Sequence, residues 1–87
     1  MKLLAIGFGN YLSTEKILAM LAPDSAPIKR LISDSRDRGL LVDASFGRST
    51  RAVILMSTGH VILSARSPDE LADLQAEADG LSERSGT

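Results

Sequence analysis

Residues 25–56 read SAPIKRLISDSRDRGLLVDASFGRSTRAVILM, and this stretch decides the fold because it contains a helix pattern, two strand patterns and a charged loop. It holds six of the ten Lys and Arg residues of the 87-residue chain and three Asp residues. Its net charge is therefore +3, whereas residues 1–28 sum to 0 and residues 52–87 to −4. Such a local excess attracts a polyanion even though the whole chain carries −1, because charges beyond roughly 10 Å are screened. Nucleic acid is therefore the first partner to consider.

A helix is predicted over residues 25–38 of this stretch. Pro23 interrupts the preceding pattern, Ser25 offers an N-cap oxygen, and Pro27 suits the first helical turn. Gly39 supplies a residue that can end a helix in the left-handed conformation. The predicted inward stripe follows i, i+3, i+4, i+7 spacing and comprises Ile28, Leu31, Ile32 and Ser35. The charged residues left on the other faces are Lys29, Arg30, Asp34, Arg36 and Asp37.

Three strands are predicted to follow this helix. Residues 40–45 (LLVDAS) form a central strand, and residues 47–50 form a polar loop. Residues 51–57 (RAVILMS) and 60–65 (HVILSA) are rich in Val and Ile and are separated by a Thr-Gly pair. This arrangement indicates a hairpin whose two strands pair antiparallel.

Two further strands are predicted before the helix. Residues 2–8 (KLLAIGF) are a short apolar run ended by Gly9 and Asn10, which indicates a buried strand leading into a turn. Residues 17–22 (ILAMLA) fit a strand, which we favour, or a short helix capped by Ser13.

A second helix is predicted near the C-terminus. Ser67 as N-cap, Pro68 at the first helical position and Glu70 three residues past the cap form a capping box. The apolar stripe of this helix comprises Leu71, Leu74 and Ala78. The predicted fold class is therefore α+β, a small, mostly antiparallel sheet with one central helix and one C-terminal helix. We expect residues 1–80 to form a single domain and residues 81–87 (LSERSGT) to form a frayed tail.

Length and composition favour self-association. A chain of 87 residues buries only about 60–65% of its unfolded surface, so its core is thin. Hydrophobic residues make up 44% of the chain, yet the aromatic ones are only Phe8, Tyr11 and Phe46. Such a chain gains buried area by packing against copies of itself, so a homo-oligomer is expected.

The same composition bears on the compartment. The absence of cysteine excludes a disulfide framework and a thiolate metal site, and it fits a reducing environment. Glycine and charged residues interrupt the apolar run of residues 1–22 well short of the ~18 residues that a membrane span needs. We therefore expect a cytoplasmic protein that does not cross a membrane.

Few residues suit catalysis or small-molecule binding. The GFGN turn at residues 7–10 lacks the third glycine and the following Lys-Ser/Thr pair of a phosphate loop. A tight turn with positive φ at Gly9 or Asn10 is the simpler interpretation. His60 is the only histidine, so it would have to hold a metal or act as a base with carboxylates scattered along the chain. We therefore expect no enzyme, no metal, no cofactor and no small-molecule substrate.

Arg48 and Arg51 are better candidates for a binding site. They flank a short loop held between two strands, where two long cationic side chains can be aimed at one phosphate. A plain solvated loop is the alternative. The arginines of the predicted helix are weaker candidates, because they alternate with aspartates and can pair locally.

Several segments carry a family likeness: IGFGN, SAPIKR, SRDRGLLVDASFGRSTRAVILM and HVILSA resemble the RemA-type bacterial extracellular matrix regulatory proteins. The resemblance extends over nearly the whole chain up to Pro68, so the domain of residues 1–80 is RemA-like. It implies a DNA-binding transcriptional regulator of matrix and biofilm genes. It also implies a ring-like homo-oligomer that binds double-stranded DNA along its basic surface.

The resemblance also assigns DNA-binding positions. Arg48 aligns with the first arginine of the GRRTR loop that is usual in the family, and Ser49 stands in place of the second. Lys16, in STEKI, replaces an arginine, which keeps the charge but loses bidentate geometry. Arg51 is retained from the TRAV motif. The alternative is a structural or scaffolding oligomer that binds protein partners and has weak or no DNA binding.

Overall fold

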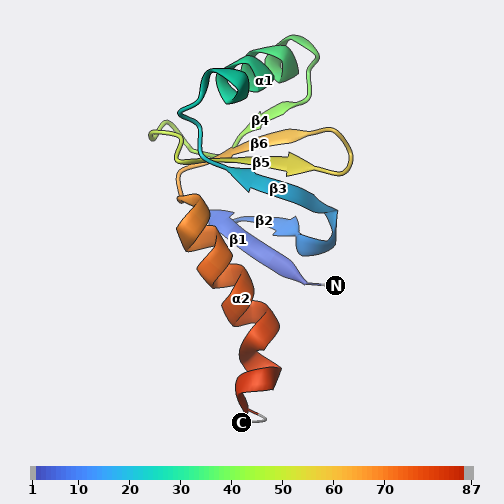
Figure 1. Cartoon of the computed structure of the whole chain (residues 1–87), viewed down its shortest axis with the longest axis vertical. Coiled ribbons are helices and arrows are strands. Elements are labelled where there is room, and N and C mark those ends of the chain that lie inside the picture. The colour runs from blue at the N-terminus through green and yellow to red at the C-terminus, as the bar shows by residue number, and fades with distance from the viewer. Residues whose placement is uncertain (1, 86–87) are drawn as a thin grey trace.

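The computed structural model of the chain describes the backbone of residues 2–85 and the side chains of residues 2–77 (Figure 1). Within these residues, two helices, one 3-10 turn and two sheets confirm the predicted α+β class with mostly antiparallel pairing. In chain order the elements are β1 (Leu3–Gly7), β2 (Asn10–Ser13), the 3-10 helix η1 (Thr14–Lys16), β3 (Ile17–Leu21), α1 (Ala26–Asp37), β4 (Leu41–Asp43), β5 (Ala52–Met56), β6 (Val61–Ser64) and α2 (Pro68–Ser85).

The larger sheet has four strands in the order β3-β5-β6-β4 (Figure 1). β5 pairs antiparallel with both β3 and β6, which confirms the predicted hairpin. The prediction of a central strand at residues 40–45 is wrong, because β4 is a three-residue edge strand that pairs parallel with β6. β5 and β6 take the centre because they are apolar on both faces, whereas Val42 and Asp43 of β4 are exposed and suit an edge.

Both faces of this sheet are covered. Successive residues of β5 point to opposite sides, so β5 contributes to the apolar cluster on each face. On one side, Ile54 belongs to a cluster with Leu4 of β1 and Leu71 of α2, all of them at most 1% exposed. On the other side, Val53 and Leu63 form a cluster with half-buried side chains of α1, which are Ile28, Leu31 and Ile32. The four-stranded sheet therefore lies between α1 and a layer made of β1, β2 and α2 (Figure 1).

The prediction of one sheet is wrong, because β1 and β2 form a separate two-stranded antiparallel sheet. The strand predicted at residues 2–8 is confirmed as β1. The sequence pattern does not predict β2, because NYLS is too short and too mixed in polarity to show a strand period. A buried hydrogen bond joins the two sheets, in which Ser64 Oγ donates to the Ile6 carbonyl oxygen over 2.9 Å.

The segment that links the two sheets also contains predicted features. The strand favoured for residues 17–22 is confirmed as β3, which pairs with β5 through Met20 and Ile54 among others. The predicted positive φ at Gly9 is confirmed at +78°. Asn10 does not share this conformation, whereas Phe8 does, at φ +54°.

Both helices begin as predicted. At α1, the Ile28 N–H donates to Ser25 Oγ over 3.4 Å, and Gly39 follows the helix with φ +72°. Ser35 is buried, which confirms the inward stripe of α1. At α2, the Glu70 N–H donates to Ser67 Oγ and the Ser67 N–H donates to Glu70 Oε1, both over 3.2 Å.

The structure describes two of the three residues in the predicted apolar stripe of α2. Leu71 is fully buried and Leu74 is half-buried, as predicted. The side chain of Ala78 and those of residues 81–87 lie outside the described residues, so the predicted tail stays a prediction. Among the described helices, none is long and apolar enough to cross a membrane.

Candidate functional site

The four predicted DNA-binding residues lie at two opposite ends of β5. At its start, the Arg51 N–H donates to the Ser64 carbonyl over 2.8 Å. At its other end, the Ser57 N–H donates to the Lys16 carbonyl over 2.7 Å. Five strand residues separate these ends by about 17 Å at roughly 3.4 Å per residue. The structure therefore brings Arg48, Ser49 and Arg51 into one loop and leaves Lys16 apart from them.

We name these two regions after their connections. The loop end comprises residues 44–51 together with the GFGN turn at residues 7–10 and residues 65–70, which lead into α2. The hairpin end comprises the turn at residues 57–60 together with Lys16. Arg48, Ser49, Arg51 and Lys16 are all exposed, so each predicted residue is accessible to a large partner.

Asp43 shapes the start of the loop. Its Oδ1 accepts hydrogen bonds from the Ser45 hydroxyl and, over 2.9 Å, from the Ser45 N–H. These two bonds, the hydroxyl first, hold the pKa of the Asp43 carboxyl below its usual value, because they favour its charged form. The Arg48 N–H then donates to the Ser45 carbonyl over 3.1 Å, so the loop folds back on itself before Arg48.

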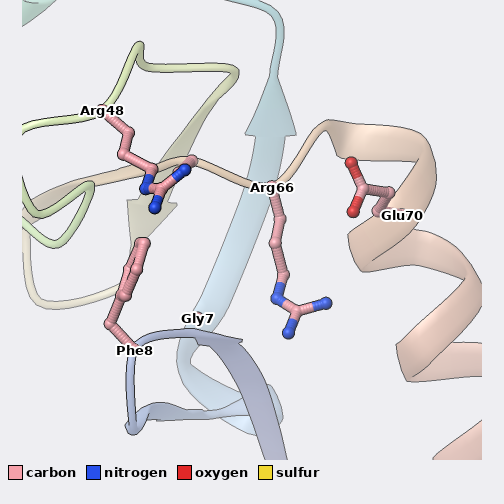
Figure 2. A pocket seen from close by; sticks show the side chains of 6 residues that line it. Gly7, Phe8, Arg48, Arg66 and Glu70 are labelled. Carbon is pink, nitrogen blue, oxygen red and sulfur yellow. The ribbon is translucent and has the colours of Figure 1, made fainter.

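Two phenylalanines stack beside Arg48. The ring centroids of Phe8 and Phe46 are 5.2 Å apart with 21° between the ring planes. Arg48 Cζ lies 5.6 Å from the Phe8 centroid, which is within cation–π range (Figure 2). The stack therefore holds the Arg48 guanidinium at the surface and limits its freedom, which would lower the entropy cost of binding an anion there.

Both phenylalanines adopt an unusual backbone conformation. Phe8 has φ +54° and Phe46 has φ +58°, and these are the positive φ values among the described non-glycine residues. For bulky residues this region costs about 1–3 kcal/mol each, and such strain clusters at functional sites. Phe8 and Phe46 nevertheless stay 48% and 77% exposed, so burial in the hydrophobic core does not offset the strain.

Arg51 is paired across the loop end. Its Nη1 donates to Glu70 Oε1 over 3.0 Å, and both side chains are about half exposed. The pKa of the Glu70 carboxyl lies below its usual value, first because it accepts the Ser67 N–H and the Ser67 hydroxyl, and then because Arg51 and Arg66 are near. Arg51 is therefore partly neutralised and serves to hold the loop against the start of α2.

Arg66 completes the cluster, and the sequence analysis did not identify it. Its Nε is shielded from solvent and has no acceptor among the described residues. A buried donor without a partner costs about 1–3 kcal/mol. The Nε lies beside the backbone of Gly7, whose φ of +110° requires glycine.

A pocket of about 270 Å³ opens between these groups (Figure 2). Arg48 and Phe8 lie on one side of it and Arg66 and Glu70 on the other. Its lining consists of Gly7, Phe8, Arg48, Ala65, Arg66 and Glu70. With two arginines and one glutamate, the lining favours an anion.

Two signals in the sequence point to the residues missed. Each phenylalanine stands next to glycine, in Gly7-Phe8-Gly9 and in Phe46-Gly47, and a large ring inside a glycine turn is placed at a surface. Arg66 directly precedes the capping box of α2, which places a cation near the Glu70 carboxylate. In the part of the chain that the structure describes, no group of three His, Cys, Asp or Glu residues is placed to hold a metal.

Comparison with known proteins identifies the family. A family model described as RemA-like, extracellular matrix regulatory protein A-like, matches residues 3–73. Extracellular matrix regulatory protein A of Bacillus subtilis (strain 168) is 54% identical over 71 residues, which cover 82% of this chain and 80% of that protein. A protein of Desulforamulus reducens, named provisionally as a regulatory protein, is 56% identical over 72 residues, 83% of this chain and 80% of its own.

A similarly named protein of Clostridium kluyveri is 51% identical over 85 residues, which cover 94% of this chain and 92% of that protein. These names are those of regulatory proteins and not of enzymes. The family model covers both the GFGN turn and the arginine loop. The chain therefore belongs to the RemA-like family, the extracellular matrix regulatory protein A-like proteins.

Proposed function

We propose that this protein is a DNA-binding transcriptional regulator of extracellular matrix and biofilm genes that works in the cytoplasm as a ring-like homo-oligomer. The observation that carries the proposal is the state of Arg48. Its side chain is exposed, lies against Phe8, and makes no ion pair with any described carboxylate. A cation held in this way is available to a DNA phosphate, whereas Arg51 already shares Glu70.

Family membership supports the regulatory part of the proposal. The Bacillus subtilis relative is named for regulation of the extracellular matrix, and it is more than half identical to this chain over their shared length. The family model also covers Lys16, Arg48, Ser49 and Arg51. A shared role in matrix regulation is therefore the function we assign first.

Exposed apolar surface supports self-assembly. Outside the loop end, the large hydrophobic side chains exposed on the described surface are Leu3, Tyr11, Leu18 and Val42. β3 and β4 are the two edges of the four-stranded sheet, and an edge strand is a ready site for contact with another chain. A domain of this size gains stability when a second copy covers such surfaces.

The separation of Lys16 from Arg48 is compatible with a head-to-tail arrangement of the copies, which we propose. A head-to-tail contact places the hairpin end of one protomer beside the loop end of the next. Repeated with a rotation that divides a full turn evenly and has no translation along the axis, this contact closes a ring. Lys16 of one protomer and Arg48 of its neighbour then lie on one continuous basic surface.

Such a ring compensates for weak single contacts. Each protomer offers Arg48, with Arg51 and Lys16 as weaker contributors, so one copy makes few phosphate contacts. Linking sites raises overall affinity by about 10²–10⁴ without any new contact, provided that the geometry allows simultaneous binding. Binding should therefore depend on assembly.

The test combines the mass of the protein in solution with a mobility shift on duplex DNA at about 50 and 200 mM salt. We expect a mass of many subunits and a steep loss of affinity at the higher salt, because phosphate contacts release counterions. A monomer at micromolar concentration would contradict the proposed ring and the gain in affinity from linked sites. An affinity for duplex DNA that does not depend on salt would contradict the proposed phosphate contacts.

The alternative, a scaffolding oligomer that binds protein partners, rests on a specific observation. Of the predicted DNA-binding positions, one carries serine in place of arginine, and Arg51 is paired with Glu70. A scaffold should form the same oligomer and show no salt-dependent binding to duplex DNA. The same pair of measurements therefore separates the two functions.

A further inference from the structure

The pocket at the loop end contains features that binding to duplex DNA does not use. Arg66 lines it with a guanidinium whose Nε has no acceptor among the described residues. Phe8 and Phe46, from two separate turns, stack beside it in a strained backbone conformation. The bases of a duplex are paired and stacked, so they have no free face to place on these rings. The pocket is therefore suited to a different ligand.

We propose that this pocket binds one unpaired nucleotide, with its phosphate on Arg66 and Arg48 and its base on the Phe8–Phe46 stack. The nucleotide is either a free mononucleotide or one residue of a single strand, since both present the same phosphate and the same free base. This function goes beyond duplex binding and does not require it.

The phosphate end is built by two arginines from different segments. Arg48 comes from the loop before β5 and Arg66 from the segment between β6 and α2, and they lie on opposite sides of the pocket (Figure 2). A phosphate has several acceptor oxygens, so a phosphate that lies between these two side chains can accept hydrogen bonds from both when the guanidinium groups turn toward it. Glu70 opposes the anion, but its Oε1 already accepts hydrogen bonds from Arg51 and Ser67.

The base end is formed by the exposed rings. Phe46 is 77% exposed and Phe8 is 48% exposed, so a planar group can reach them from solvent. Stacking on aromatic side chains holds every base, because each base has a π face. The strained backbone at both phenylalanines keeps these rings at the surface, where they serve binding and not the core.

The size of the pocket agrees with this division. Pockets for small molecules usually measure about 300–1,000 Å³, and this one is slightly smaller, with about 270 Å³. It therefore accommodates the phosphate, while the base lies on the rings at the rim. A ligand that has only one of these two parts should bind more weakly than the whole nucleotide.

The test uses the whole chain with adenosine 5′-monophosphate (AMP) as the probe. Calorimetry measures its affinity, and saturation-transfer NMR shows which ligand protons contact the protein. We expect saturation of the adenine protons and an affinity about tenfold or more above those of inorganic phosphate and of adenosine. Saturation transfer works with large assemblies, so a ring does not hinder it.

Matched variants assign the two ends. Phe46→Ala should weaken AMP about tenfold and remove the base signal, whereas Tyr11→Ala removes another exposed ring outside the pocket and should change neither. Arg66→Gln should weaken both AMP and phosphate, whereas Arg38→Gln removes an exposed charge at the end of α1 and should weaken neither. Unchanged melting temperature and mass confirm that each variant is folded.

Competition identifies the source of the nucleotide. A short oligo(dA) strand that displaces AMP and binds more tightly supports a single-strand site, and AMP binding without displacement supports a free-nucleotide site. The proposal is overturned if AMP binds no more tightly than phosphate, or if Phe46→Ala binds AMP as well as the parent. A mobility shift with duplex DNA on the same sample keeps this outcome separate from the proposed regulatory function.

Discussion

Each end of β5 is connected to a neighbouring strand, and the two connections differ in their hydrogen bonding and backbone conformation. At the hairpin end the polar groups are satisfied locally. The Met56 N–H donates to the His60 carbonyl over 2.9 Å, and Thr58 Oγ1 lies 2.8 Å from His60 Nδ1. At the loop end, Phe46 has a positive φ and Arg66 Nε has no acceptor among the described residues.

This difference distinguishes a connection with a structural role from one that is suited to binding. A turn that only reverses the chain can satisfy its own groups and has no need of strain. A region that keeps exposed rings and an exposed arginine without a carboxylate partner among the described residues leaves groups that a bound partner can contact. The loop end is therefore the surface that we propose for binding, and Lys16 is the residue that we propose to contribute from the hairpin end.

Exchange of Arg48 for alanine should have the largest effect. Duplex DNA affinity should fall by about 100-fold or more at moderate salt, because one cation is lost from every protomer and avidity multiplies the loss. Its side chain is exposed, so the mass of the oligomer should not change. Mobility shifts and light scattering measure the two quantities.

Two control variants accompany Arg48→Ala. Arg38→Ala removes an exposed arginine at the end of α1 and should leave DNA binding unaltered. Lys16→Ala, at the hairpin end, should weaken binding less than Arg48→Ala does. A larger loss of affinity with Lys16→Ala would mean that the main phosphate contact lies at the hairpin end and not at the loop end.

Leu71→Ala should have the second largest effect, on stability. Leu71 is fully buried beneath the loop end, so its truncation should lower the free energy of unfolding by about 2–5 kcal/mol. Ile32→Ala should cost less, because Ile32 is only half-buried on α1, and Asp34→Ala on the exposed face should be nearly silent. Denaturant titrations at a fixed protomer concentration measure all three. An equal loss from Leu71→Ala and Asp34→Ala would contradict the layers described above.

Ser49→Arg should increase the difference between the two ends, because it adds a cation for DNA binding at the loop end. The substitution restores the second arginine of the usual family loop at an exposed position. Duplex affinity should rise several-fold, and the slope of log K against log salt should steepen by about 0.9 for each added phosphate contact. Titrations at several salt concentrations measure the slope. An unchanged slope would mean that position 49 does not face DNA.

Acid pH should have the smallest effect. It should lower the stability of the folded protein through two carboxylates at or beside the loop end. The pKa values of Asp43 and Glu70 are both lowered in the folded protein. Each carboxylate therefore adds stability above its unfolded pKa, and this stability is lost as the pH falls through the lower, folded value. Melting temperatures should decline below about pH 4.5. Asp43→Asn should flatten part of this decline, and an unaltered pH profile would show that Asp43 does not contribute.

The sequence predicts those parts of the fold that local chemistry determines. Ser25 and Gly39 delimit α1, Ser67 and Glu70 start α2, and the Val- and Ile-rich runs form the β5–β6 hairpin. In each case the signal lies within a few residues of the element that it specifies. These predictions are therefore confirmed.

The parts that the sequence does not predict depend on contacts between distant residues. β4 lies at an edge because the β5–β6 hairpin occupies the centre, and no pattern within residues 40–45 reveals this. β2 exists because β1 offers a partner. In the candidate site, Arg48 is identified from its loop, whereas its contact with Phe8 and the pocket with Arg66 arise when three separate segments meet.

The Ser64–Ile6 hydrogen bond has a consequence for the order in which the molecule opens. The two-stranded sheet can open before the four-stranded sheet unfolds, because β1 and β2 pair only with each other and are joined to the larger sheet by one buried hydroxyl and an apolar layer. The amide protons of β1 and β2 should then exchange with solvent earlier than those of β5. Since Phe8 lies at the tip of the β1–β2 hairpin, each such opening removes its ring from Arg48, so the lifetime of the loop-end site is set by the sub-global opening of the smaller sheet.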